Sequence, residues 1–233
     1  MAKFQFKSFS LNQSDSSFKI GTDACLLGAW TEAKSQISLL DIGVGTGVIS
    51  AMIAQRYRDL QIFGVDLNPA SVVLAEENFA QHQSIKDYQV FLKDLNSWEA
   101  PQAFDLIVSN PPFFANSEES KRTHLAKARH QSSLSLNEIL KFSSEYLNEN
   151  GSLALIMPIS ELEGFREQMG VFGFYINRLA LLKPLAHKEV HRAMLQISKT
   201  ESKPEEEHFE IEKERGQYSE RAYELLKDYL LLL

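Results

Sequence analysis

The residues with the clearest chemical signature lie at 109–114, which read Ser-Asn-Pro-Pro-Phe-Phe and follow an apolar run at 104–108. Two consecutive prolines exclude a helix here and remove two backbone donors, so a buried strand must end in a rigid, extended turn. One carboxamide, Asn110, and two aromatic rings stand at the mouth of that turn. An amide oxygen, an exposed carbonyl and a ring face can together hold a flat group that carries an amine.

A glycine-rich loop follows an apolar segment upstream, with an acid at Asp41 and glycines at Gly43, Gly45 and Gly47. Glycines let the backbone pass close to a ligand where any Cβ would clash. The dinucleotide fingerprint needs its third small residue one position later, at Val48, and its turn cradles a pyrophosphate that Asp41 would repel. The spacing therefore favours a ligand with a cationic amino group, such as the methionine end of S-adenosylmethionine.

Two further acids follow the next two predicted strands. Asp66 ends the strand at 61–66, where a carboxylate can accept both hydroxyls of a ribose. Asp94 follows the strand at 88–92 and can accept from an adenine amine. Each acid alone is more often a cap or turn residue. Because successive parallel strands end at the same edge of a sheet, three acids beside a glycine loop predict a nucleoside site at that edge.

The elements that must position these residues alternate along the chain. Strands are expected at 37–41, 61–66, 88–92, 104–109 and 152–157, helices at 46–57, 69–80 and from 136, and a closing hairpin at 172–182 and 193–198. This order predicts an α/β fold of three layers, doubly wound, with a mainly parallel seven-stranded sheet and a closing antiparallel hairpin. We expect a single domain over 1–233. It comprises a flanking segment (1–34), a catalytic core (35–200), and a charged linker with a C-terminal docking helix (201–233).

Composition limits the class of protein. The chain has 233 residues, of which 44% are hydrophobic, and this suits one sizeable domain. Neither a secretory signal nor a membrane span is visible, and no metal site is expected. The single cysteine, Cys25, excludes an internal disulfide and fits a reducing cytoplasm. The net charge of −7 argues against a general nucleic-acid coat protein. We expect a cytoplasmic monomer with no obligate protein partner.

Positive charge is concentrated in two segments, 121–130 and 183–192. The first directly follows the proline turn, with four fixed positive charges and no acid, and the second has three cations against one acid. Each segment is compatible either with phosphate contacts or with a solvated loop. The candidate substrate contacts in the first segment are Lys121, Arg122, Lys127, Arg129 and His130.

The acids, the glycine loop and the Asn-Pro-Pro-Phe turn together resemble the class I S-adenosylmethionine-dependent methyltransferases of the amino-methylating branch. In that family the tetrapeptide Asn-Pro-Pro-Phe/Tyr forms the catalytic pocket. The core similarity extends over roughly 35–200. Besides the core motifs, the segments 19–30, 128–130 and 218–229 resemble the bacterial valine-tRNA adenine methyltransferases, with Ser219 where relatives often have Thr.

The resemblance implies S-adenosylmethionine as cofactor and a tRNA as partner, with transfer to the N6 amine of the adenine 3′ of the anticodon in a valine tRNA. By resemblance, Thr22 and Asp23 line the cofactor or substrate side. The predicted catalytic residues are Asn110, Pro111, Pro112 and Phe113. In this scheme the Asn110 amide oxygen and the Pro111 carbonyl accept the amine hydrogens while Phe113 stacks on the base.

Other functions remain open at this stage. A methyltransferase for a release-factor glutamine or for an rRNA guanine amine would use the same pocket. We expect no counterpart of the long helical N-terminal domain that release-factor enzymes carry, which disfavours the first of these. A non-catalytic S-adenosylmethionine-binding module or RNA chaperone is disfavoured by the intact Asn-Pro-Pro-Phe, and a nicotinamide dehydrogenase by the glycine spacing.

Overall fold

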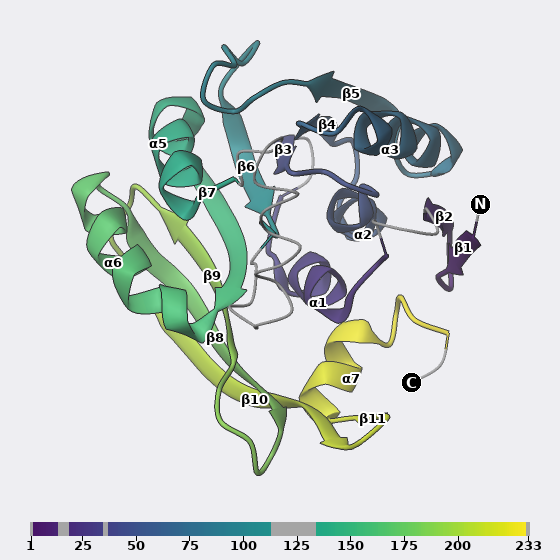
Figure 1. Cartoon of the computed structure of the whole chain (residues 1–233), viewed down its shortest axis with the longest axis vertical. Helices are drawn as coiled ribbons and strands as arrows, with labels where there is room; N and C mark the ends of the chain where they lie inside the picture. Colours follow the sequence, from purple (N-terminus) through teal and green to yellow (C-terminus); the bar gives the residue numbers. More distant parts are fainter. Residues whose placement is uncertain (1, 14–18, 35–36, 113–133, 232–233) are drawn as a thin grey trace, which may run out of the picture.

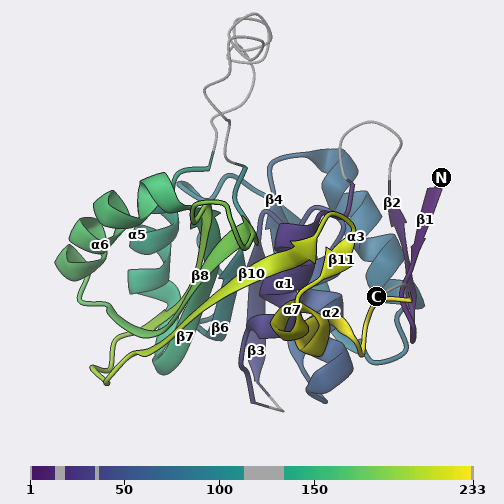
Figure 2. The ribbon, with the colours of Figure 1, turned by 90° about the horizontal axis from the view of Figure 1, so that it is seen from below.

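The computed structural model describes residues 2–13, 19–34, 37–112 and 134–231. Its main body is a twisted nine-stranded sheet with helices on both faces, and a two-stranded hairpin lies apart from the sheet (Figures 1 and 2). The predicted three-layer α/β class is confirmed. Phe113 and the basic segment at 121–130 lie outside the described residues, so their predicted roles stay predictions.

The main sheet has the order β11-β10-β8-β9-β7-β6-β3-β4-β5. Strand β9 runs antiparallel to β7 and β8, β11 runs antiparallel to β10, and the other pairs are parallel. The strands are β3 (Ser38–Ile42), β4 (Gln61–Asp66), β5 (Asp87–Leu92), β6 (Phe104–Ser109), β7 (Leu147–Pro158), β8 (Tyr175–Leu185), β9 (Arg192–Ser198), β10 (Glu205–Glu214) and β11 (Gln217–Tyr218). The expected seven strands run from β8 to β5, and β10 and β11 extend the sheet beyond them.

Helices cover the two faces of the sheet and enclose two hydrophobic clusters. On one face lie α1 (Thr22–Trp30), α2 (Val48–Arg56), α3 (Pro69–Gln81) and α7 (Glu220–Leu226); on the other lie α5 (Leu136–Tyr146), the 3-10 turn η1 (Ile159–Glu161) and α6 (Leu162–Val171) (Figure 2). Within the described ranges, no helix is long and apolar enough to cross a membrane.

Local sequence explains where these elements begin. Every residue of β3 is buried, as a central strand covered on both faces requires. Asn68 caps α3 by accepting from the Ala70 amide at 2.9 Å, and Pro69 occupies the first helical position. Ser135 and Glu138 form the capping box predicted for α5. Helices α3 and α5 therefore start where the sequence predicts.

The expected linker after residue 200 is wrong. Residues Glu205–Glu214 form β10, which pairs in parallel with β8. Two alternate side chains in the middle of this charged segment, Phe209 and Ile211, are apolar and buried, at 6% and 7% exposure, as the two-residue period of a strand requires. Helix α7 follows after β11 and ends at Leu226, and it is shorter than the docking helix that the amphipathic pattern over 218–233 predicts.

The N-terminal hairpin, β1 (Ala2–Gln5) and β2 (Ser10–Gln13), packs near the other end of the chain (Figure 1). Phe6 is fully buried and forms an isolated bridge with Leu230. The Lys7 amide donates to the Tyr229 carbonyl at 2.7 Å. The flanking segment is thus an integral part of the body rather than an appendage.

Candidate active site

The glycine loop joins β3 to α2 and turns tightly over the end of β4. Gly43, Gly45 and Gly47 have φ of 72°, 53° and 74°, in the left-handed region that side chains disfavour. The Gly43 and Val44 amides both donate to the Val65 carbonyl, at 2.8 and 3.2 Å. The loop is therefore fixed against its neighbouring strand, and its backbone is free of side chains at three positions.

A pocket of about 480 Å³ opens beside this loop. One wall consists of residues 19–24, the other of 43–46 with Val48 and Ile49, and Asn110 completes the lining. Five predicted site residues therefore meet in one cavity: Thr22, Asp23, Gly43, Gly45 and Asn110. The other four described candidates for cofactor binding are not in the lining: Asp41, Gly47, Asp66 and Asp94.

Asp66 holds the loop from the end of β4. Its carboxylate accepts from the Gly45 amide at 3.1 Å and from the Asn68 amide at 2.8 Å. An ionised carboxylate has about four acceptor positions, so these two bonds leave others available. Asp66 is half-buried beside the loop, a position consistent with its predicted contact to ribose hydroxyls.

Asp41 is buried against α2 rather than exposed to the pocket. Its side chain accepts from the Ser50 hydroxyl at 2.8 Å, while its second oxygen is buried without a partner. Burial raises the pKa of this carboxyl to about 7, and the hydrogen bonds from Ser50 oppose that rise only in part. A carboxylate at the first turn of α2 complements the helix dipole. The geometry thus gives Asp41 a supporting position behind the glycine loop.

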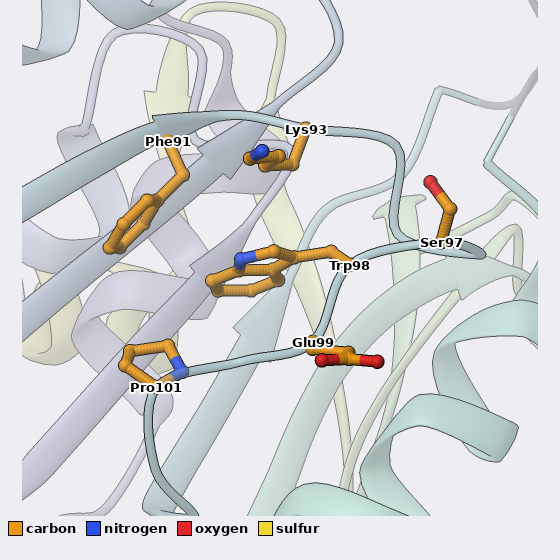
Figure 3. Close-up of a pocket in the computed structure, with 6 residues that line it drawn as sticks. All are labelled: Phe91, Lys93, Ser97, Trp98, Glu99 and Pro101. Atoms are coloured by element: carbon orange, nitrogen blue, oxygen red, sulfur yellow. The ribbon is translucent and has the colours of Figure 1, made fainter.

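Asp94 lies in a turn after β5, and its side chain accepts hydrogen bonds from groups of that same turn. Its carboxylate accepts from the Asn96 backbone amide at 3.0 Å, and the Lys93 amide donates to the Asp66 carbonyl at 3.1 Å, so the two acidic turns adjoin. A second hollow of about 360 Å³ adjoins this turn, with the Trp98 ring between Phe91 and Pro101 (Figure 3). It contains none of the predicted site residues.

The proline turn begins where β6 ends. The Ser109 hydroxyl donates to the Ile42 carbonyl at 2.8 Å, which ties the end of β6 to the end of β3 and its glycine loop. Asn110 follows half-buried in the pocket lining, Pro111 is buried and Pro112 is exposed. The strand ends thus bring the predicted catalytic carboxamide to the cavity beside the glycine loop.

Sequence reasoning missed Asn78 and noted Arg192 only as a cation of the basic segment at 183–192. Arg192, at the start of β9, pairs with Asp23 in the pocket wall, with 2.8 Å between Nε and Oδ2. Asn78 on α3 is 1% exposed and donates to the Thr46 carbonyl of the loop at 2.8 Å. Nothing local in the sequence marks either partnership, because the paired residues lie far apart along the chain.

The pocket has the chemistry that S-adenosylmethionine requires. Its volume lies in the usual range for small-ligand sites, roughly 300–1,000 Å³. A Cβ added at Gly45 would meet no protein atom closer than 3.8 Å, so the space beside this backbone is open to a ligand. The half-buried Asp66 stands next to the loop with acceptor capacity to spare. The open backbone at Gly45 and the Asp66 carboxylate beside the loop therefore fit the ribose of a nucleoside.

Comparison with known proteins shows the family of the chain. The methyltransferase small domain family model matches residues 9–163. The tRNA1(Val) (adenine(37)-N6)-methyltransferase of Vibrio campbellii is 32% identical over 228 residues, covering 98% of this chain and 95% of that protein. The protein of the same name from Parabacteroides distasonis is 33% identical over 231 residues, covering 98% and 97%.

Solved structures share the fold at low sequence identity. A protein described as a predicted O-methyltransferase from Agrobacterium tumefaciens superposes with a TM-score of 0.65 at 15% identity, covering 88% of this chain and 96% of that one. A methyltransferase from Pyrococcus furiosus gives 0.62 at 15% identity, covering 84% and 91%. Family model, relatives and fold agree: the chain belongs to the methyltransferase small domain family and is a class I S-adenosylmethionine-dependent methyltransferase.

Proposed function

We propose that this protein transfers the methyl group of S-adenosylmethionine to the N6 amine of an adenine in tRNA, at the adenine 3′ of the anticodon of a valine tRNA. The observation that carries the proposal is the position of Asn110, in the lining of the same cavity as the glycine loop. The tRNA is supported by the names of relatives that are 31–35% identical over 98% of the chain.

The mechanism follows from the acceptor chemistry. The adenine amine is a poor nucleophile because its lone pair is delocalised into the ring. The Asn110 amide oxygen and the Pro111 carbonyl each accept one amine hydrogen, which localises the lone pair and aims it away from the ring plane. The cofactor supplies an electrophilic sulfonium methyl group. Phe113 stacks on the base and fixes its plane.

Catalysis in this scheme is alignment, because no general base is needed before transfer and the product proton leaves afterwards. Holding two reactants in line can supply several kcal/mol of the barrier, and a misplacement of about 1 Å can cost about a hundredfold in rate. The proline pair keeps the backbone next to Asn110 rigid, since each proline fixes its own φ.

The target adenine must leave its base stack to enter the pocket, and this costs less in an RNA loop than in a duplex.

The decisive experiment identifies the methylated product. The protein is incubated with labelled S-adenosylmethionine and bulk tRNA that lacks the modification, and the nucleosides are then separated by mass spectrometry. We expect label in N6-methyladenosine, located 3′ of the anticodon in valine tRNA. Parallel incubations contain rRNA or a release factor in place of tRNA, and label in an rRNA guanine or in a release-factor glutamine would replace this proposal with one of its alternatives. Binding of the cofactor without transfer to any of these acceptors would favour a non-catalytic module.

The role of Asn110 has its own test. Asn110→Ala removes the amide acceptor, so transfer is expected to fall by about a hundredfold or more while the cofactor still binds. Asn150→Ala is a matched control, because Asn150 is exposed and lies near the start of β7, at the opposite end of the strands. Full activity of the Asn110→Ala variant would remove Asn110 from the mechanism.

A further inference from the structure

The two walls of the pocket are connected through one buried carboxamide on α3. Asn78 is 1% exposed, and its amide nitrogen donates to the Thr46 carbonyl of the glycine loop at 2.8 Å. The same nitrogen donates to the Asn12 carbonyl of β2 at 3.0 Å. Its oxygen accepts from the Asn12 amide at 2.7 Å. Asn78 therefore binds the cofactor loop and the N-terminal hairpin at once.

The connection continues from the hairpin into the opposite wall. Gln13, the last residue of β2, accepts through its side chain from the Ile20 amide at 3.1 Å. Ile20 lines the pocket, as does Thr46 on the facing side. A path of hydrogen bonds thus runs from Thr46 through Asn78 and the hairpin to Ile20. The distance between the walls depends on this path as well as on the packing of α1 against α2.

Asn78 is well suited to hold such a position. Each of its bonds goes to a backbone group, so a change of side chain at Asn12 or Thr46 would leave them in place. Burial prevents water from replacing a lost partner, so a missing bond leaves a backbone carbonyl unsatisfied. Its neighbour Phe79 is fully buried against Gly47, where the loop ends and α2 begins. This stretch of α3 therefore fixes the loop at two points.

We propose that Asn78 is a positioning residue that clamps the two walls of the pocket and so sets the affinity for S-adenosylmethionine. The proposal rests on the assignment of this pocket to the cofactor. When the clamp is lost, the hairpin and the loop move independently, and the binding-competent arrangement is populated in only a fraction of molecules. The apparent dissociation constant then rises by the inverse of that fraction.

The test compares cofactor affinity with stability. Calorimetry with S-adenosylmethionine is expected to show an affinity about tenfold weaker for Asn78→Ala, corresponding to one competent molecule in about ten. Hydrogen exchange of the Ile20 amide, measured without cofactor, is expected to accelerate. Gln13→Ala breaks only the second step of the path and is expected to weaken binding in the same direction with little loss of stability.

Gln196 provides a matched control. Its side chain is 7% exposed and also makes three hydrogen bonds, two with the Glu32 backbone and one with the Ser152 hydroxyl, away from the pocket. Gln196→Ala is therefore expected to lower the melting temperature as Asn78→Ala does and to leave cofactor affinity unchanged. If both variants lose stability and both retain affinity, Asn78 is a structural residue only and the proposal fails.

A further variant separates this proposal from the pocket assignment. Gly45→Ala places a side chain in the left-handed loop position beside the pocket, so it is expected to weaken cofactor binding. If Gly45→Ala binds the cofactor with wild-type affinity, the cofactor lies elsewhere, and both the pocket assignment and the Asn78 clamp are overturned. Weak binding by Gly45→Ala with normal binding by Asn78→Ala and Gln13→Ala would overturn the clamp alone.

Discussion

Individual carboxylates at the edge of the sheet have different tasks, although the sequence presents them as equivalent. Asp66 accepts from the backbone amides of Gly45 in the glycine loop and of Asn68 just after β4, whereas Asp41 is 1% exposed and binds Ser50 of α2. Asp23 is committed to Arg192. The two acids at strand ends therefore support the glycine loop differently, Asp66 from its backbone and Asp41 from α2, while Asp23 of α1 is paired with a side chain of β9.

Asp41 makes the stability of the protein depend on pH. Burial raises its pKa from 3.8 to about 7, so between these values the folded protein holds a proton that the unfolded chain has released. The contribution of Asp41 to the free energy of unfolding is therefore greatest on the acid side of this window. It falls as the pH rises and becomes constant above about pH 7, with a total change of about 4 kcal/mol.

Asp41→Asn removes this titration while it preserves the shape of the side chain. Urea unfolding of both proteins across the same pH window should show the wild-type free energy of unfolding declining relative to that of the variant. Other titrating groups are common to both proteins and cancel in the difference. A difference that does not vary with pH would show that the Asp41 carboxyl has an ordinary pKa in the folded state.

At the scale of elements, the glycine loop works because α2 starts in close contact with α3. A Cβ at Gly47 would lie 2.4 Å from the Phe79 ring, and φ at Gly47 is 74°. The glycine is therefore required both by its backbone conformation and by the approach of the neighbouring helix. Since the same short loop lines the pocket, packing between two helices determines where its backbone faces a ligand.

Gly47→Ala should consequently destabilise the protein and weaken cofactor binding together. Left-handed strain and overpacking each cost about 1–3 kcal/mol. Gly164→Ala is the control, because Gly164 lies in α6 and no atom lies within 4 Å of the added Cβ. Its free energy of unfolding should rise by about 0.5–1 kcal/mol. Thermal unfolding measures the change in stability, and calorimetry measures the change in cofactor affinity. A Gly47→Ala variant as stable as the wild type would mean that Phe79 can move aside without cost.

At the scale of the whole molecule, the last thirty or so residues complete the core around α1. Strand β10 extends the sheet and α7 packs against α1, so every residue of α1 from Ala24 to Trp30 is buried. Arg178 of β8 lies over the Trp30 ring at 4.3 Å and donates to the Trp30 carbonyl at 3.0 Å. The Trp30 indole donates to Glu207 of β10 at 2.7 Å. This junction joins α1, whose first turn lines the pocket, to the C-terminal part of the sheet.

Arg178→Ala should lower stability by about 2 kcal/mol through loss of the cation–π contact and the backbone hydrogen bond. The ion pairs of Arg178 with Glu32 and Glu205 contribute little, because both glutamates are largely exposed. Arg166→Ala, at an exposed position of α6, should change stability by less than about 0.5 kcal/mol. The denaturant midpoints of the Arg178→Ala and Arg166→Ala variants measure both changes in stability. Equal midpoints for the two variants would show that the junction does not stabilise the fold.

Much of the core was predictable because its signals are local. The bounds of β4 and β6 match the predicted strands, and the caps at Asn68 and Ser135 start α3 and α5 as expected. Such signals reside in a few neighbouring residues: apolar runs, capping side chains and prolines. The residues at 205–214 misled the prediction because a strand on the outer part of a sheet needs only alternate apolar side chains, and its charged residues read as a linker.

The sequence by itself determined the succession of the seven core strands along the chain, the glycine loop and the Asn-Pro-Pro turn, and hence the kind of reaction expected at the carboxyl edge. Only the tertiary structure decided which groups cooperate there. It joins Asn12 to Asn78 across 66 positions, Asp23 to Arg192 across 169 and Trp30 to Glu207 across 177. It also buried Asp41 against α2 while Asn110 came to line the pocket. The physical reason is that burial and long-range hydrogen bonds arise from packing between elements, which no pattern of neighbouring residues encodes.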